Sequence, residues 1–407
     1  PTAPQPRPPL WTKFSETAKN ISRSGKLCLS GQPRRSHHTF GRQVNLAADH
    51  PMPRPARDKS ISALNARPGL LRANAPPKRP KVMFCRAASF AAQRTVSLNI
   101  FRAGTLLPFK PGLTITMLSK QRYSDYDTFL AQYRVEAPQD FNYSFDVIDR
   151  ITAEEPDRRA MIHVSPEGEV KEYTFAWFTE QSCRLATALA AQGVKKGDRI
   201  MLILYRRVEF WVSMLALHRI GAIAIPATAQ LTVKDIVFRA VHARLAGVIV
   251  EDSLVERVEG ARREYNGWEH LIVVSSVLQF GDVASDAIYA PPYDAAPLPE
   301  GWTDFDDLIH AGEPGMPKPA RPELAAGDDP MIIFFSSGTT GMPKMVQHGH
   351  TYPLGHFMTA AYWHDLEGDD VHLTLADSGW SKSSWGKLYG QWMQRATVFA
   401  WDFRGKF

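Results

Sequence analysis

Residues 334–346, with the sequence FFSSGTTGMPKMV, decide how the rest of this 407-residue chain is interpreted. They begin at the end of an apolar run, residues 331–335, which predicts a buried strand. Four hydroxyl side chains and two glycines then fill six positions, and Lys344 follows. Glycines let a backbone approach a ligand closely, while successive N–H groups, hydroxyls and an ammonium group attract an anion. The stretch therefore predicts a loop that binds a chain of phosphates.

Two other interpretations compete with phosphate binding by this stretch. A run rich in Gly, Ser and Thr is commonly an ordinary surface loop. The Walker phosphate loop has its lysine directly after a glycine and before Ser or Thr, whereas Lys344 lies between Pro343 and Met345. The position of Lys344 excludes the Walker loop, and the length of the motif after a strand favours phosphate binding over an ordinary loop.

The stretch closely resembles the phosphate-binding signature of the adenylate-forming enzymes, S/T-S/T-G-S/T-S/T-G-x-P-K-G. This family comprises acyl-CoA synthetases, luciferases and the adenylation domains of peptide synthetases. Positions 336–344 match throughout, and Met345 replaces the usual final glycine. The resemblance implies that ATP is bound by Ser336, Ser337, Gly338, Thr339, Thr340, Gly341, Met342, Pro343 and Lys344. It also implies catalytic roles for Lys344 and Thr340.

Strands and helices alternate through the region before the loop. Strands are predicted at 199–204, 222–226, 247–250 and 271–275, and a helix at 208–219 that is apolar nearly all round. A second helix begins at Thr232, which forms a capping box with Asp235. This alternation predicts an α/β fold, a doubly wound parallel sheet with helices on both faces. The resemblance implies the same fold, as part of the large N-terminal domain of an adenylate-forming enzyme.

A second short motif follows a strand predicted at 371–375. Its residues, Asp377-Ser378-Gly379-Trp380, resemble a segment of medium-chain acyl-CoA synthetases. Ligands of open α/β sheets lie beyond the carboxyl ends of the strands, so Trp380 is a candidate for the wall of an acyl pocket. An equally open alternative is that Trp380 is an ordinary core aromatic.

The first 116 residues differ in composition from the rest. They hold half of the 30 prolines, and the first 120 residues carry 21 of the 48 Lys and Arg side chains but only three of the 42 acids. Such a segment buries too little apolar surface to fold, so residues 1–116 are predicted to be a disordered basic extension and residues 117–407 the folded domain. The extension is interpreted as upstream sequence preceding a start at Met117, as an organelle presequence, or as a nucleic-acid-binding arm; no nucleic-acid partner is expected.

Other residues limit the classes of function. The three cysteines are too far apart for a disulfide framework or a zinc motif, and no apolar run is long enough to span a membrane. His348 and His350 are assigned ordinary packing or hydrogen-bonding roles, and no metal ligand is predicted. Five acidic residues are expected to be solvated: Glu251, Asp252, Asp304, Asp306 and Asp307. The expected location is cytoplasmic, or the mitochondrial matrix if the extension is a presequence.

The resemblance covers about the first half of an adenylate-forming enzyme, and the given sequence ends at Phe407. It implies an acyl-CoA synthetase that activates a carboxylic acid with ATP and Mg²⁺ through an acyl-adenylate and transfers it to coenzyme A. Because the part that holds the ribose, the metal and the mobile lysine domain has no counterpart in these residues, the chain is expected to be inactive alone. The alternative is a non-catalytic nucleotide-binding fragment.

Overall fold

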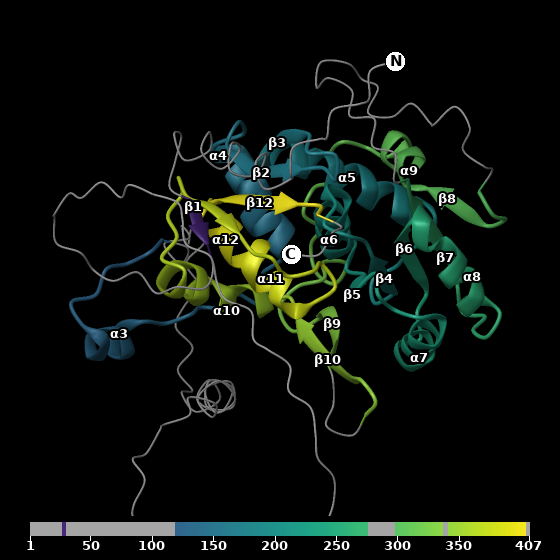
Figure 1. Ribbon diagram of the computed structural model, residues 1–407. Coiled ribbons are helices and arrows are strands. Elements are labelled where there is room, and N and C mark those ends of the chain that lie inside the picture. Colours follow the sequence, from purple (N-terminus) through teal and green to yellow (C-terminus); the bar gives the residue numbers. More distant parts are fainter. Residues whose placement is uncertain (1–26, 30–118, 276–297, 337–340, 404–407) are drawn as a thin grey trace, which may run out of the picture. The chain divides into compact units, whose positions relative to one another are not determined.

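The computed structural model describes residues 27–29, 119–275, 298–336 and 341–403 (Figure 1). By its contacts the chain divides into two units, one formed by Pro1–Arg34 with Ile115–Phe407 and the other by Arg35–Thr114. All of the described residues belong to the first unit. The predicted boundary at Met117 lies outside the described residues, so the division of the chain there stays a prediction.

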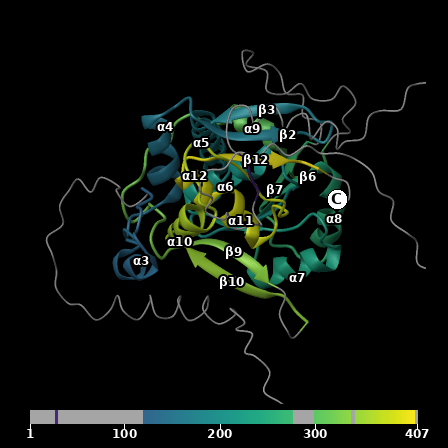
Figure 2. The same ribbon diagram turned by 60° about the vertical axis from the view of Figure 1, so that its left-hand side comes forward.

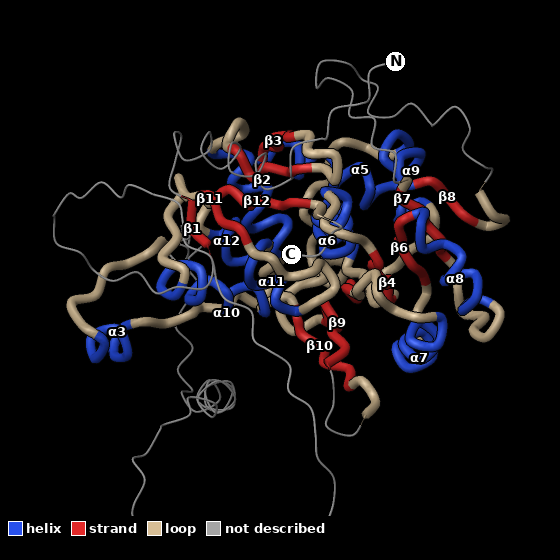
Figure 3. The backbone as a smooth tube through the Cα atoms, in the orientation of Figure 1, coloured by secondary structure: helices blue, strands red, loops and turns tan. Residues whose placement is uncertain are grey.

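The larger sheet has seven strands within the described residues (Figure 3). Their order is β10 (Lys344–Gly349), β9 (Pro330–Ser336), β5 (Ile223–Pro226), β4 (Arg199–Ile203), β6 (Gly247–Glu251), β7 (His270–Val274) and β8 (Trp302–Asp304). Every neighbouring pair is parallel except β10 and β9. The chain enters at β4 and then builds the sheet outward on both sides, which is the doubly wound arrangement.

The smaller sheet has five strands in the described part of the chain. Their order is β1 (Leu27–Leu29), β11 (Val371–Leu373), β12 (Thr397–Trp401), β2 (Arg159–Val164) and β3 (Val170–Thr174). The strands from β1 to β2 are parallel, and β3 pairs with β2 in an antiparallel hairpin. Of the predicted extension at residues 1–116, the structure describes β1 alone.

Helices connect most of these strands. The longer ones are α5 (Phe175–Ala191), α6 (Val208–Ile220), α7 (Val233–Ala243) and α8 (Val255–Arg262). Shorter ones are α3 (Tyr126–Gln132), η2 (Ser144–Asp149), α4 (Arg150–Glu154), η3 (Asp252–Leu254), α9 (Phe305–Ala311), α10 (Tyr352–Met358), η4 (Thr359–Trp363), α11 (Ser381–Lys387) and α12 (Tyr389–Met393). The elements η2 and η4 are π-helical, and η3 is a 3₁₀ turn.

One apolar core joins the two sheets. It takes side chains from both sheets and from α5, α6, α10 and α12, so these helices lie between the sheets. The indole N–H of Trp392 donates to the Ala160 carbonyl at 2.9 Å, which ties α12 to β2. A second cluster on the opposite face of the larger sheet is built from that sheet with α7 and α8. The larger sheet is therefore covered by helices on both faces, as predicted.

Local signals explain the best-predicted helices. The helix α6 is buried on nearly every side, and Gly221 ends it with a φ of 74°, a conformation that glycine adopts without strain. The helix α7 begins with the predicted capping box, in which the side chains and backbone N–H groups of Thr232 and Asp235 bond reciprocally. In both α6 and α7 the local sequence signals agree with the helix that the structure shows.

The structure refines the predicted fold, corrects one expectation and decides between two alternatives. The parallel strands are divided between two sheets, because β2, β11 and β12 pair with one another rather than with β4. Glu251 and Asp306 are buried, so the expectation that the five acidic residues are solvated is wrong for these two. Trp380 is 59% exposed and is not a core aromatic.

Candidate functional site

The strands β9 and β10 form a hairpin that carries the described part of the predicted phosphate-binding loop at its tip (Figure 2). Lys344 is opposite Ser336 in the register, and the Ser336 hydroxyl donates a long hydrogen bond of 3.5 Å to the Lys344 carbonyl. Ser337, Gly338, Thr339 and Thr340 lie outside the described residues. The structure therefore brings the two ends of the motif together and leaves the positions of its four central residues as predictions.

The described residues at the tip suit an anion. Gly341 has a φ of 88°, and no heavy atom lies within 4 Å of a Cβ built on it. Lys344 and Met342 are exposed, and no carboxylate of the described residues forms an ion pair with the Lys344 ammonium group. An exposed ammonium group three residues after a left-handed glycine can bind a phosphate without first breaking an ion pair.

The second motif forms a tight turn between β11 and α11. The Asp377 side chain accepts from the Gly379 N–H at 3.0 Å, and the Asp377 carbonyl accepts from the Trp380 N–H at 3.1 Å. Trp380 stands at the first position before α11 and leaves most of its side chain exposed. The turn thus fixes the backbone of Trp380 while its ring stays available for contact with a ligand.

This turn joins the carboxyl ends of strands from both sheets. The Ser378 hydroxyl donates to the carbonyl of Tyr205, which follows β4, at 3.1 Å. A Cβ atom on Gly379 would lie 2.1 Å from the carbonyl carbon of Ala227, which follows β5. Only glycine permits so close an approach between two backbones. Because β9 is parallel to β5, Ser336 lies at the carboxyl edge of the same sheet.

The described ends of the first motif and the second motif therefore lie at the edge where α/β sheets bind ligands. Among the described residues, no hydrogen bond or ring contact joins Trp380 to the hairpin. The structure places the described ends of the phosphate-loop motif and the turn before Trp380 on one edge of the fold.

Sequence reasoning missed Lys387, which lies beneath the turn. Its side chain is 1% exposed, and its ammonium group donates to the carbonyl of Ala376. Burial, reinforced by the nearby Arg206 cation, lowers the pKa of Lys387 to about 7. A lysine is by default assigned to the surface. The only local signal of burial was that the neighbouring residues in the sequence are apolar or aromatic.

The two histidines after the loop are in packing environments. His348 lies on β10 with its ring 4.2 Å from that of Tyr352, and His350 is completely buried. Burial lowers the pKa of His350 to about 4, so its ring is neutral near neutral pH. Within the described ranges, no group of three or more His, Cys, Asp or Glu side chains is arranged to hold a metal ion. No described helix combines the length and the apolar character needed to cross a membrane.

Comparison with known proteins gives a family match over most of the described domain. The family model "AMP-binding enzyme" matches residues 148–403. Human "Acyl-coenzyme A synthetase ACSM3, mitochondrial" is 30% identical over 288 residues, which cover 69% of this chain and 45% of that protein. Rat "Acyl-coenzyme A synthetase ACSM5, mitochondrial" is 30% identical over 269 residues, which cover 64% of this chain and 42% of that protein. The chain thus matches less than half the length of these curated relatives.

Solved structures share the fold at lower identity. The anthranilate CoA ligase AuaEII, in complex with anthranoyl-AMP, superposes with a TM-score of 0.55 and 22% identity, covering 66% of this chain and 46% of that one. Acetoacetyl-CoA synthetase from Streptomyces lividans superposes with a TM-score of 0.54 and 22% identity. The superposition covers 65% of this chain and 38% of that one. These similarities show the fold alone.

Proposed function

Since the AMP-binding enzyme model matches residues 148–403, this chain belongs to that family, and we propose that it supplies the ATP-binding part of an acyl-CoA synthetase. The single observation that carries the proposal is the hairpin register, which brings Ser336 opposite an exposed Lys344 at the carboxyl edge of the sheet. The names of the curated relatives support acyl-CoA synthesis.

The proposed reaction has two steps. The carboxylate of the acid attacks the α-phosphorus of ATP, so that an acyl-adenylate forms and pyrophosphate leaves. The thiol sulfur of coenzyme A then attacks the acyl carbon, and AMP leaves while the thiol proton is released. Negative charge grows on the phosphate oxygens during the first step, and fixed N–H and hydroxyl donors stabilise such charge.

We assign the residues of the loop as follows. The donors from Ser336 to Gly341 bind the β- and γ-phosphates, and Met342 and Pro343 set the path of the backbone to the lysine. Lys344 supplies a mobile positive charge beside the phosphates, and Thr340 is assigned a catalytic role as a hydroxyl donor. Mg²⁺ is proposed as the companion of ATP, although no described residue is assigned as its ligand.

Trp380 is proposed to line the site of the acyl group. Its large exposed ring follows the turn at the sheet edge, where an apolar substrate would gain contact area. The small-molecule partners are then a carboxylic acid, ATP and coenzyme A. Because the chain spans less than half the length of its curated relatives, turnover is proposed for a protein that also contains the remainder, and the 407 residues alone are expected to bind without turnover.

A lysine variant tests the proposal on the given chain. We expect Lys344→Ala to weaken the binding of ATP with Mg²⁺, measured by calorimetry, by roughly tenfold or more, because a charge-assisted hydrogen bond is lost. The matched control is Lys234→Ala, which removes an exposed lysine from α7. Equal ATP affinities of Lys344→Ala and the unchanged chain, with equal melting temperatures, would refute the assignment.

The division at Met117 and the cellular location are proposals from composition. Limited trypsin digestion is expected to leave a fragment that starts near Met117, and protection of Arg34, Arg57 or Arg79 from cleavage would contradict this division. The cytoplasm remains our expected location. The mitochondrial matrix is the alternative, supported by the names of the relatives and by the basic composition of residues 1–116.

A further inference from the structure

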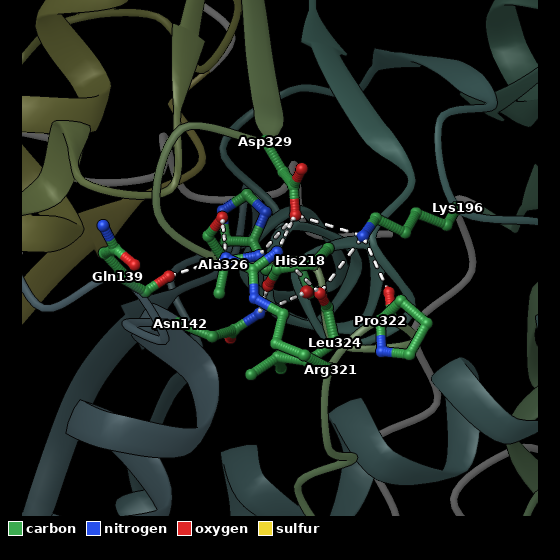
Figure 4. Close-up of polar contacts among 10 residues, drawn as sticks. Gln139, Asn142, Lys196, His218, Arg321, Pro322, Leu324, Ala326 and Asp329 are labelled. Atoms are coloured by element: carbon green, nitrogen blue, oxygen red, sulfur yellow. Dashed lines mark hydrogen bonds and ion pairs between the residues drawn. The ribbon is translucent and has the colours of Figure 1, made fainter.

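Three donors surround the carboxylate of Asp329, the residue immediately before β9 (Figure 4). One of its carboxylate oxygens, Oδ2, lies 2.6 Å from Arg321 Nη1 and 3.1 Å from Lys196 Nζ. The same oxygen accepts from the Ala326 N–H at 3.1 Å. Two cations and a backbone donor therefore converge on one oxygen at the base of the hairpin.

The two cations also bind neighbouring backbone. Lys196 Nζ donates to the carbonyls of Pro322 and Leu324, each at 3.1 Å. Arg321 Nη2 donates to the carbonyl of Ala326 at 2.9 Å and to that of Gln139 at 2.6 Å. The cluster thus holds the segment that leads into β9 as one unit, and Figure 4 shows the side chains pointing toward one another.

The same short segment holds the other end of the hairpin. After β10, the His350 N–H donates to the Asp329 carbonyl at 3.2 Å, and the Thr351 N–H donates to the Gly327 carbonyl at 3.1 Å. A Cβ atom on Gly349 would lie 2.9 Å from the Gly327 carbonyl oxygen, so the two backbones are in close contact. Both the entry to β9 and the exit from β10 are therefore tied to residues 327–329.

The cluster is also attached to the middle of the sheet. Lys196 lies three residues before β4, and Gly221 lies two residues before β5. A Cβ atom on Gly221 would meet Ala325 Cβ at 2.5 Å and Lys196 Cγ at 3.0 Å. The amino ends of β4, β5 and β9 are thus packed together around this cluster.

We propose that Asp329, through its contacts with Lys196 and Arg321, is a positioning residue that fixes the β9–β10 hairpin and thereby the residues that bind the phosphates. β10 pairs only with β9 among the described strands, so its placement depends on β9 and on the base. β9 carries this restraint over seven residues, roughly 20 Å at the rise of a strand, from Asp329 to Ser336. The effect of this positioning role on ATP binding rests on the proposed function.

The test compares Asp329→Asn and Lys196→Met in the 407-residue chain with Glu172→Gln. The last variant is a matched control, since Glu172 forms a partly exposed ion pair with Arg159 at 2.8 Å on the smaller sheet. Hydrogen exchange is measured for the amides of β10 and, as an internal reference, for those of β4. ATP affinity with Mg²⁺ is measured on the same samples.

We expect Asp329→Asn and Lys196→Met to speed exchange in β10 by about five- to tenfold, with β4 changed less than about twofold, because charge-assisted contacts at the base are lost. ATP affinity should fall by about the same factor. Lys196→Arg keeps the cation, so this variant should retain most of the slow exchange in β10 and most of the ATP affinity. Glu172→Gln should change neither the exchange in β10 nor the ATP affinity.

Four other outcomes would count against one of the two proposals. Unchanged exchange in β10, or equal acceleration in β10 and β4, overturns the positioning role because the cluster would then be dispensable or merely stabilising. Local acceleration in β10 without any change in the affinity of a chain that binds ATP also overturns it. If the unchanged chain binds no ATP, the proposed function fails, whereas the exchange of β10 still decides whether the cluster fixes the hairpin.

Discussion

The backbone of Ala227 passes so close to Gly379 that a Cβ atom on this glycine would lie 2.1 Å from the Ala227 carbonyl carbon. This contact locks the turn after β11 against the end of β5 and so joins the two sheets at their carboxyl edges. The relation explains why the turn carries a glycine directly before Trp380.

Gly379→Ala is predicted to destabilise the fold, because either the turn or the Ala227 backbone must move. We expect a loss of about 1–3 kcal/mol in the free energy of unfolding, measured by denaturant titration. The control is Gly355→Ala in α10, where no heavy atom lies within 4 Å of the added carbon and alanine favours the helix. Equal stabilities of the two variants would show that the turn is not sterically fixed.

Asp149→Ala tests an ion pair between the partly exposed Asp149 of η2 and the buried Arg219 of α6. The Arg219 side chain is fully buried, donates to Asp149 Oδ2 at 2.7 Å and also binds the Ser182 hydroxyl. Without Asp149 the guanidinium group stays buried without its carboxylate, so we expect a loss of about 2–4 kcal/mol in unfolding experiments. Glu172→Gln, which opens a partly exposed pair, should cost less than about 1 kcal/mol. A cost for Asp149→Ala no larger than this control would contradict the prediction.

How much the sequence could predict depends on whether the deciding signal was local. The helix α6 and the capping box of Thr232 and Asp235 were predicted because their residues lie next to one another in the chain. β9 was predicted from its apolar run, whereas β10 was not, because its mostly exposed residues carry no alternating pattern.

Residues brought together by the fold could not be predicted. Asp329 meets Lys196 from more than a hundred residues away, and neither neighbourhood in the sequence indicates the other. Lys387 was assigned to no role, since only tertiary packing removes a lysine from water. For Trp380 the sequence left two alternatives, and the exposure of the ring excluded the core position.

Trp380→Ala is predicted to affect the acid substrate more than the fold. Because the side chain is 59% exposed, the free energy of unfolding should change by less than about 0.5 kcal/mol. If the ring lines the acyl site, the affinity for hexanoate in the presence of ATP and Mg²⁺ should fall severalfold in calorimetric titrations. Trp363→Ala, which removes a ring that is 82% exposed elsewhere on the surface, should leave that affinity unchanged. Matching hexanoate affinities in the two variants would remove Trp380 from the site.

The last prediction concerns Lys387 and pH. Burial lowers the pKa of this lysine to about 7 in the folded protein, against about 10.4 for a lysine in an unfolded chain. Between these values the unfolded chain binds a proton at this site that the folded protein does not. Stability must therefore rise with pH across this window, and the cost of the buried charge is fully present below it.

Lys387→Met removes the titrating group while keeping an apolar side chain of similar length against Trp211, whose ring centre lies 5.7 Å from the ammonium nitrogen. We expect the free energy of unfolding of the unchanged protein to rise by about 2–3 kcal/mol relative to that of this variant between pH 7 and pH 9.5, measured by denaturant unfolding at each pH. Taking the difference between the two proteins cancels the other groups that titrate in this range. A difference that stays constant with pH would mean that Lys387 keeps an ordinary pKa, and that its ammonium group is charged where it binds the Ala376 carbonyl.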